Sequence, residues 1–221
     1  VTYGGDSKYA PKSINGTKFM VNPNTIWDMT IIGNYKPYGE NSTFTIRNIP
    51  SDILGNNLTI NIDGINYVVP ISNGVATLTL NNLSAGLHDA FVTYAGDANY
   101  INKTKKFFPS IPQATPTVTL IQNGTDLIAL VTGNATGNVT FSVNNVEYTV
   151  DLTSGRNATL IGKLRIGENY VLATYNGDEN YTQANTMNVF NVDKLNTTIT
   201  VTPTNITFGQ DEIITVSVDA N

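Results

Sequence analysis

The only histidine of the chain, His88, stands beside Asp89, and the pair could act as a general base with an orienting carboxylate. The pair opens a stretch of alternating apolar residues, however, and adjacent side chains of a strand point to opposite faces. At the matching positions 81 residues further on, the chain has Asn169 and Tyr170. A catalytic site needs several converging groups. We therefore predict that the chain has no catalytic residues and is not an enzyme.

The composition excludes most other kinds of catalytic or metal-binding site. The chain has no cysteine, which excludes disulfides, thiolate zinc sites, iron–sulfur clusters and cysteine nucleophiles. One histidine also excludes any centre that needs two imidazoles. We predict no metal site and no cofactor.

A motif with a carboxylate, Thr-Tyr-x-Gly-Asp-x-x-Tyr, occurs three times. Glycine can adopt the positive φ of a tight hairpin, and aspartate can accept backbone N–H groups across the next turn. The alternative is calcium, bound by these carboxylates with neighbours such as Glu179, but each copy offers only one or two acidic groups. We favour turn capping. The motif residues are Tyr3, Gly5, Asp6 and Tyr9; Tyr94, Gly96, Asp97 and Tyr100; and Tyr175, Gly177, Asp178 and Tyr181.

The recurring tyrosines allow two interpretations. They could form a platform on which carbohydrate stacks, or they could pack the core and clamp a hairpin. A residue that closes each domain must recur in every copy, whereas a binding residue need not. We therefore predict a structural role for the tyrosines.

The motif returns at a domain-sized period, 91 residues from Tyr3 to Tyr94 and 81 from Tyr94 to Tyr175. Short connectors at 109–112 and 192–195 predict that neighbouring repeats form a semi-rigid rod. The predicted domains are 1–20, the C-terminal hairpin of a preceding repeat; 21–111, a full repeat with an insertion at 23–42; 112–192, a second full repeat; and 193–221, the first strands of a following repeat.

The repeats have strand patterns. Residues 58–63 and 139–144 superpose at an offset of 81, and both alternate apolar with polar residues. Breakers such as Asp63-Gly64 and Asn123-Gly124 separate such runs, and no helical stripe is present. An antiparallel β-sandwich follows. At 157–160 the apolar phase slips by one residue relative to 76–78, which we attribute to a bulge in one copy.

The net charge and the composition limit the classes of partner that the chain can bind. Thirty residues are Asn and 31 are Thr, types that favour turns and strands respectively. The net charge of −5 and the pI of about 4.7 argue against nucleic acid, which requires a clustered basic surface. No apolar run is long enough to span a membrane. We expect no direct membrane insertion of this fragment, and any targeting signal to lie outside it.

The hairpin motif, the Asn-Gly-Val-Ala-Thr-Leu stretch at 73–78 and the Leu-Ser-Ala-Gly turn at 83–86 together resemble the immunoglobulin-like repeats of prokaryotic surface proteins. The chain looks most like the adhesin-like proteins of methanogenic archaea, over all residues except 23–42. The resemblance implies an all-β fold class of tandem immunoglobulin-like antiparallel β-sandwiches arranged end to end. It also implies an extracellular, cell-surface location, no catalysis, and a stalk that projects an adhesive region from the cell.

The expected partners are the neighbouring immunoglobulin-like repeats and a host or microbial surface glycan or protein. The 23–42 stretch holds the only tryptophan, Trp27, with Tyr35 and Tyr38, and loop insertions on a rigid scaffold often carry recognition. These three residues are the candidate ligand-binding residues. The alternative, which we favour, is that Trp27 and Ile31-Ile32 plug the end of a sandwich or pack on the preceding domain.

Three further features leave alternatives open. A filament subunit could assemble by strand addition through incomplete end repeats, although an arbitrary cut is simpler. A Lys–Asn isopeptide bond, with Lys163 as its candidate lysine, is disfavoured. Glycans on some of the dense Asn-x-Ser/Thr sequons would solubilise a weakly charged surface. The sequons begin at Asn15, Asn41, Asn57, Asn82, Asn102, Asn123, Asn134, Asn138, Asn157, Asn180, Asn196 and Asn205.

Overall fold

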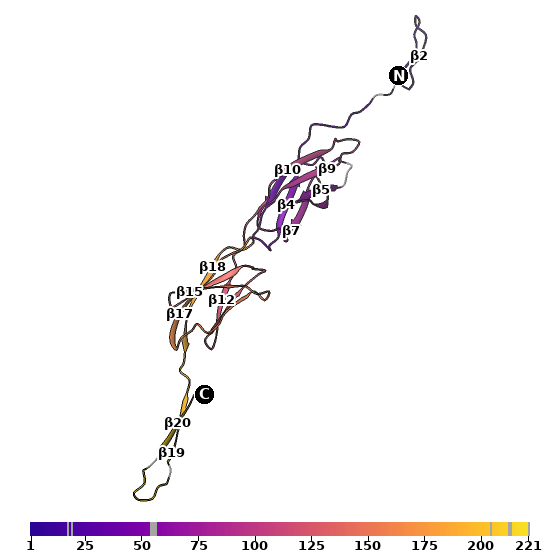
Figure 1. The fold of residues 1–221 in the computed structure, drawn as a ribbon. Coiled ribbons are helices and arrows are strands. Elements are labelled where there is room, and N and C mark those ends of the chain that lie inside the picture. The colour runs from indigo at the N-terminus through magenta and orange to yellow at the C-terminus, as the bar shows by residue number, and fades with distance from the viewer. Residues whose placement is uncertain (17, 19, 54–56, 204, 212–213, 221) are drawn as a thin grey trace. The chain divides into compact units, whose positions relative to one another are not determined.

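The computed structural model describes residues 1–221 except 17, 19, 54–56, 204, 212–213 and 221. The chain divides into two compact units, Val1–Pro112 and Gln113–Asn221. Each unit contains one complete antiparallel sandwich and one terminal hairpin (Figure 1). Every regular element among the described residues is a β-strand, which confirms the all-β fold class of tandem immunoglobulin-like sandwiches.

The first sandwich has a three-stranded and a four-stranded sheet. The first sheet has the order β3-β4-β7 and the second β10-β9-β5-β6, while β8 and β11 pair separately. The bounds are β3 Thr30–Asn34, β4 Ser42–Arg47, β5 Asn57–Ile62, β6 Ile65–Pro70, β7 Ala76–Leu80, β8 Gly86–Leu87, β9 Ala90–Tyr94, β10 Lys103–Phe107 and β11 Ser110–Ile111.

The second sandwich repeats this topology, with sheets β12-β13-β16 and β15-β14-β17-β18. In each sandwich the fourth strand pairs with the third, unlike the arrangement of a constant-type immunoglobulin domain, where it joins the opposite sheet. The bounds are β12 Val118–Asn123, β13 Asp126–Val131, β14 Asn138–Val143, β15 Val146–Asp151, β16 Asn157–Leu160, β17 Gly167–Tyr175 and β18 Ala184–Val192.

Two hairpins complete the described chain. β1 Thr2–Tyr3 pairs with β2 Lys12–Ser13, and β19 Thr197–Pro203 pairs with β20 Ile214–Ala220, both antiparallel. None of the described elements is a helix of the length and apolar character needed to cross a bilayer.

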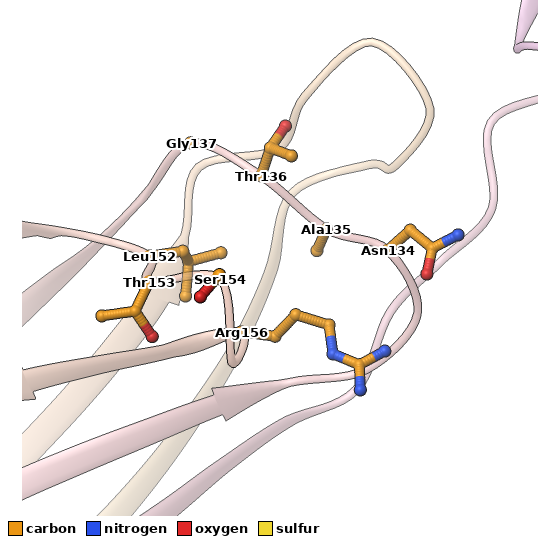
Figure 2. Close-up of a pocket in the computed structure, with 8 residues that line it drawn as sticks. All are labelled: Asn134, Ala135, Thr136, Gly137, Leu152, Thr153, Ser154 and Arg156. Atoms are coloured by element: carbon orange, nitrogen blue, oxygen red, sulfur yellow. The ribbon is translucent and has the colours of Figure 1, made fainter.

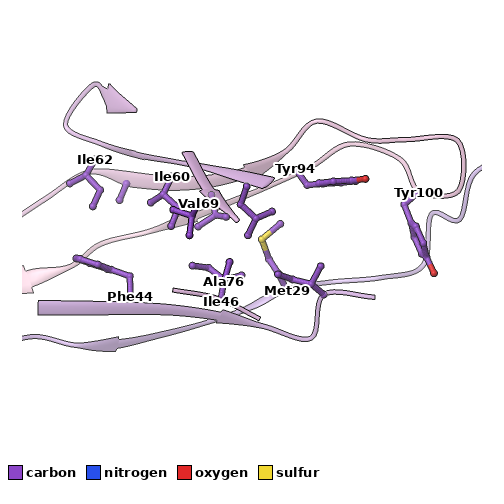
Figure 3. Packing of buried hydrophobic residues seen from close by; sticks show 13 residues of the cluster. Met29, Phe44, Ile46, Ile60, Ile62, Val69, Ala76, Tyr94 and Tyr100 are labelled. Carbon is purple, nitrogen blue, oxygen red and sulfur yellow. The ribbon is translucent and has the colours of Figure 1, made fainter. Parts of the chain in front are cut away.

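The cores come from the inward positions of alternating strands (Figure 3). In the first sandwich, Phe44 and Ile46 of β4 face Ile60 of β5 and Val92 of β9, all with no exposed surface. In the second, the corresponding fully buried residues are Leu127, Ala129, Phe141 and Ala173. Because the intervening side chains point outward, the period-two pattern of the sequence directly gives the two faces of each sheet.

The phase slip at 157–160 arises in the preceding turn. The first sandwich joins β6 to β7 through a two-residue turn, Asn73-Gly74, with φ of 50° and 74°. The second uses a three-residue loop, 154–156, which ends in Arg156 at φ 60°. A left-handed third residue is typical of such loops and adds one residue to that strand. Ala158 therefore occupies the sheet position of Ala76, and strand 157–160 itself is regular.

The stretch 23–42 is not a single inserted loop. It contains β3, whose counterpart in the second sandwich is β12, since both form the outer strand of the three-stranded sheet. Most of its extra length lies between β3 and β4, where residues 35–41 replace the two-residue turn 124–125. Strand pairing, which the repeat pattern alone does not give, is what locates β3 within this stretch.

Candidate functional site

The repeated motif forms a hairpin turn in which one carboxylate accepts hydrogen bonds from the backbone of the turn and from a tyrosine hydroxyl. In the first sandwich, Asp97 Oδ1 accepts the backbone N–H groups of Asn99 and Tyr100 at 2.7 and 2.8 Å. Oδ2 accepts the hydroxyl of the buried Tyr94 at 2.6 Å. The N–H of Asp97 donates to Tyr100 O at 2.9 Å. The carboxylate thus caps the turn and joins it to the core of the sandwich.

The N-terminal hairpin makes the same cap outside a complete sandwich. Asp6 Oδ1 accepts from Lys8 N and Tyr9 N at 2.8 and 2.9 Å, and Oδ2 accepts from the Tyr3 hydroxyl at 2.6 Å. The hydrogen bond with Tyr3 is the main reason why the pKa of Asp6 lies below its ordinary value. This copy is exposed to solvent, so the turn geometry follows from the motif alone.

In the third copy, the second carboxylate oxygen accepts hydrogen bonds from a loop residue rather than from the motif tyrosine. Asp178 Oδ1 accepts from Asn180 N and Tyr181 N, both at 2.8 Å, while Oδ2 accepts the N–H and hydroxyl of Thr136 at 2.8 and 2.9 Å. Burial alone would raise the pKa of Asp178, but these hydrogen bonds outweigh it and lower the pKa. The buried Tyr175 hydroxyl has no hydrogen-bond partner in the described part of the chain. Burial and then Asp178 raise the pKa of Tyr175.

The motif glycines have the backbone conformation that the turn requires. Gly5, Gly96 and Gly177 have φ of 81°, 91° and 84°. A Cβ on Gly96 would lie 2.9 Å from the backbone nitrogen of Asn102, closer than real Cβ atoms approach. Both the positive φ and the lack of space therefore require glycine there.

The capped turn also holds the segment that enters its own sandwich. Asn24 exchanges two backbone hydrogen bonds with the turn of the first sandwich, at 2.6 and 3.2 Å, and Ala114 makes the same pair in the second, at 3.0 and 2.9 Å. Both are parallel bridges, from Asn24 to Tyr100 and from Ala114 to Tyr181. The motif thus fixes each entering segment as well as closing a hairpin.

The last tyrosine of the motif attaches the turn to a third segment. The Tyr100 hydroxyl donates to Asp52 Oδ1 at 2.6 Å, and the Tyr181 hydroxyl accepts from Asn134 N at 3.0 Å. Both partners lie in the connection that crosses between the two sheets, β4–β5 or β13–β14. Each tyrosine is only 8% exposed, so neither offers an open face for stacking.

Metal binding at these carboxylates gains no geometric support. Over the described ranges, no three histidine or acidic side chains lie close enough together to hold an ion. The oxygens of Asp97 and Asp178 instead accept backbone and side-chain donors.

The buried His88 pairs with the half-exposed Asp63 rather than with the Asp89 side chain. Its Nδ1 is 2.5 Å from Asp63 Oδ2, and its Nε2 donates to Ser84 O at 2.9 Å. The second oxygen of Asp63 accepts Asp89 N at 3.0 Å. The hydrogen bond with His88 is the main reason why the pKa of Asp63 lies below its ordinary value.

The second sandwich builds the same cross-link from two asparagines. Asn144 Nδ2 donates to Asn169 Oδ1 at 3.0 Å, and Asn169 Nδ2 donates to Arg165 O at 2.7 Å. Asn144 Oδ1 accepts Tyr170 N at 3.0 Å. Since asparagine replaces both partners without loss of the hydrogen-bond pattern, the arrangement of His88 is explained by structure and requires no proton-transfer chemistry.

The three candidate ligand-binding aromatics are not gathered on one exposed surface. Trp27 packs edge-on against Tyr94 and Tyr100, with ring centroids 5.7 and 6.2 Å apart. Tyr35 packs against Phe44 at 5.7 Å, and burial raises the pKa of Tyr35. The half-buried Tyr38 donates its backbone N–H to Pro112 O at 2.9 Å.

Lys163, the candidate for an isopeptide bond, places its ammonium group 5.2 Å from the Tyr148 ring centroid.

Most sequons lie on the surface. The exposed sequon asparagines are Asn15, Asn41, Asn57, Asn82, Asn102, Asn123, Asn134, Asn196 and Asn205, and the partly buried ones are Asn138, Asn157 and Asn180.

Some contributors were missed by sequence reasoning. Asn24 and Ala114 act through backbone groups only, so residue type carries no signal for them. Thr136, which donates two hydrogen bonds to Asp178, lies in a loop 42 residues earlier in the chain. The backbone N–H of Tyr38, which donates to Pro112 O, was likewise not predictable from residue type.

Comparison with known proteins adds distant similarities. No family model matches the chain, and no curated protein matches it. The chain is similar to fibronectin(III)-like modules of Clostridium thermocellum CbhA, with 11% identity over 75% of this chain and 94% of that chain and a TM-score of 0.30.

Two further solved structures are similar. A 1.5-MDa bacterial ice-binding adhesin has 14% identity over 81% of this chain and 70% of that chain, with a TM-score of 0.33. Chicken CNTN1 FN1–FN3 domains have 9% identity over 78% and 68%, with a TM-score of 0.28. The fold assignment rests on the strand pairing itself.

We predict that Asp97→Ala lowers the free energy of unfolding of the first sandwich by about 1–3 kcal/mol, because two N–H groups and a buried hydroxyl lose a charged acceptor. Asp97→Asn, which keeps one acceptor oxygen, should cost less. Denaturant unfolding of the full chain measures both. Asp151→Ala, at an exposed residue of β15, is the control. Equal stability of Asp97→Ala and the control would contradict the role of the cap.

We also predict that the first sandwich gains acid resistance when Asp63→Asn and His88→Asn are combined, copying Asn144 and Asn169. The pKa of Asp63 is lower in the folded state than its ordinary value of 3.8. Its contribution is therefore complete above about pH 4 and is lost as the pH falls through the folded-state pKa. Below pH 4, the melting temperature of the double variant should fall by about 2–5 °C less than that of the unmodified protein. Parallel curves for both proteins from pH 6 to 2 would refute this.

Proposed function

We propose that this chain is a non-catalytic stalk segment of an extracellular, cell-surface protein, in which tandem sandwiches project an adhesive region away from the cell. Its partners in that role are the neighbouring repeats of the same protein. The observation that carries the proposal is the connector between the two sandwiches, whose residues are hydrogen-bonded to one unit or the other. A mechanical spacer benefits from short connections between its domains, and most residues of this connector are held by hydrogen bonds within the two units.

The first half of the connector is held by the first unit. Pro109 O accepts His88 N at 2.8 Å, and residues 110–111 form β11, which pairs with β8. Pro112 O then accepts Tyr38 N at 2.9 Å. The long β3–β4 connection thus has a mechanical explanation, since it reaches the last residue of its own unit.

The second half of the connector is held by the second unit. Gln113 Nε2 donates to Asp178 O and Glu179 O at 2.9 and 3.2 Å. Ala114 bonds to the capped turn, and Thr117 N donates to Thr132 Oγ1 at 2.9 Å. The change from one unit to the other occurs between Pro112 and Gln113.

The surface agrees with an exported spacer. A chain with few charged residues and many exposed Asn and Thr residues offers no large charged field. Some exposed sequons, such as those at Asn41, Asn82 and Asn102, would carry glycans, which would shield strand edges from pairing with other chains.

Residual dipolar couplings of the full chain test the proposal. We predict that the two sandwiches give alignment tensors of equal magnitude, and that a Gly-Ser-Gly-Ser insertion between Pro112 and Gln113 makes the magnitudes diverge. The same insertion after Gly64, in the β5–β6 turn, is the control and should leave them equal. Unequal magnitudes in the unmodified chain, unchanged by the connector insertion, would contradict a stiff stalk.

A further inference from the structure

The second sandwich places an arginine where the backbone favours glycine. Arg156, at φ 60°, occupies the position of Gly74 in the first sandwich, at φ 74°. A residue with a Cβ is disfavoured in this left-handed region, and no side-chain requirement of the turn itself calls for arginine. The arginine therefore carries a local backbone cost, which directs attention to its guanidinium group.

The guanidinium group is held in place but not neutralised. Nη1 donates to Gly133 O at 2.5 Å, which fixes the side chain against the β13–β14 connection. The ion pairs found among the described residues join His88 to Asp63, Lys105 to Asp28 and Lys106 to Asp89, so none involves this arginine. Its remaining N–H donors are available to a ligand.

A pocket of about 340 Å³ opens beside Arg156, between the β13–β14 connection and the β15–β16 turn (Figure 2). The side chains of Asn134 and Ser154 line it and have no hydrogen-bond partner among the described residues. Leu152 and Ala135 add an apolar surface. The site therefore combines one fixed cation, an unused carboxamide, an unused hydroxyl and a small apolar wall.

Among the described residues, the neighbouring carboxylate of Asp178 forms no ion pair with Arg156. Asp178 lies behind Thr136, which also lines the pocket, and both of its oxygens already accept hydrogen bonds from the chain. The hydroxyl of Thr136 donates to Asp178 at 2.9 Å, so its oxygen can still accept a hydrogen bond from a ligand hydroxyl.

We propose that this pocket binds a sugar unit that bears a carboxylate. The planar guanidinium fork matches a carboxylate, the amide and hydroxyl groups match ring hydroxyls, and the apolar wall matches a C–H face of the ring. The volume lies at the lower end of the range for ligand pockets, which suits one or two sugar units. The first sandwich has glycine at the same position and lacks the cation, so the site belongs to the second sandwich alone. The proposal does not depend on the stalk role.

The test is a titration of the ¹⁵N-labelled full chain with D-glucuronate, followed by NMR. The protein is made in a host without N-glycosylation, because Asn134 begins a sequon. We expect saturable shifts at the Arg156 Nε–H and at the backbone N–H groups of Asn134 and Ser154. D-Glucose, which lacks the carboxylate, and acetate, which lacks the ring, should each bind at least tenfold more weakly.

Matched variants separate binding from folding. Arg156→Gly copies Gly74 and should keep the turn while abolishing the glucuronate shifts, and Arg156→Asn, which also tolerates positive φ, should do the same. Arg165→Gln removes the same charge outside the pocket and should leave binding intact. The proposal is overturned if glucuronate gives no saturable shifts, if acetate binds equally well, or if Arg165→Gln weakens binding as much as Arg156→Gly.

Discussion

In each of the two sandwiches, one carboxylate of the repeated hairpin joins three parts of the molecule that would otherwise be independent. Asp97 and Asp178 accept two successive backbone N–H groups, which fixes the turn. The fixed turn then presents its backbone to the entering segment, at Asn24 or Ala114. A third attachment runs through the last tyrosine to the connection between the sheets. The motif therefore joins the hairpin, the core and the entering segment, which explains why it recurs with every sandwich.

The two sandwiches share this junction and differ in the chemistry placed on it. A histidine–aspartate pair in one is an asparagine pair in the other, with the same hydrogen-bond pattern. On the outer face of the four-stranded sheet, the ion pair of Asp89 and Lys106 corresponds to Tyr170 and Met187, which are 60% and 74% exposed. Such exchanges are tolerated because the cap and the alternating core leave these positions free of a role in closing the fold. Differences between repeats are thus the best guide to local function, and Arg156 in place of Gly74 is one of them.

The sequence predicts the parts that depend on local pattern. Strand alternation, positive-φ glycines and the aspartate cap need only near neighbours, and the structure has the expected strands and turns at these places. Contacts between backbone atoms of distant segments were not predictable, because Asn24, Ala114 and the Tyr38 main chain carry no residue signal. The roles suggested for Trp27 and Tyr35 rested on residue type and an apparent insertion. In the structure, Trp27 lies beside two motif tyrosines and Tyr35 lies beside Phe44.

Native-state hydrogen exchange tests most directly whether the capped turn and the entering segment belong to the cooperative unit of each sandwich. The amides of Ala114 and Thr182 bond across this junction, and those of Phe141 and Ala173 belong to paired core strands. The account predicts that all four open with the same free energy, as members of one unfolding unit. Exchange of Ala114 and Thr182 at rates typical of open loops, while Phe141 and Ala173 stay protected, would contradict it.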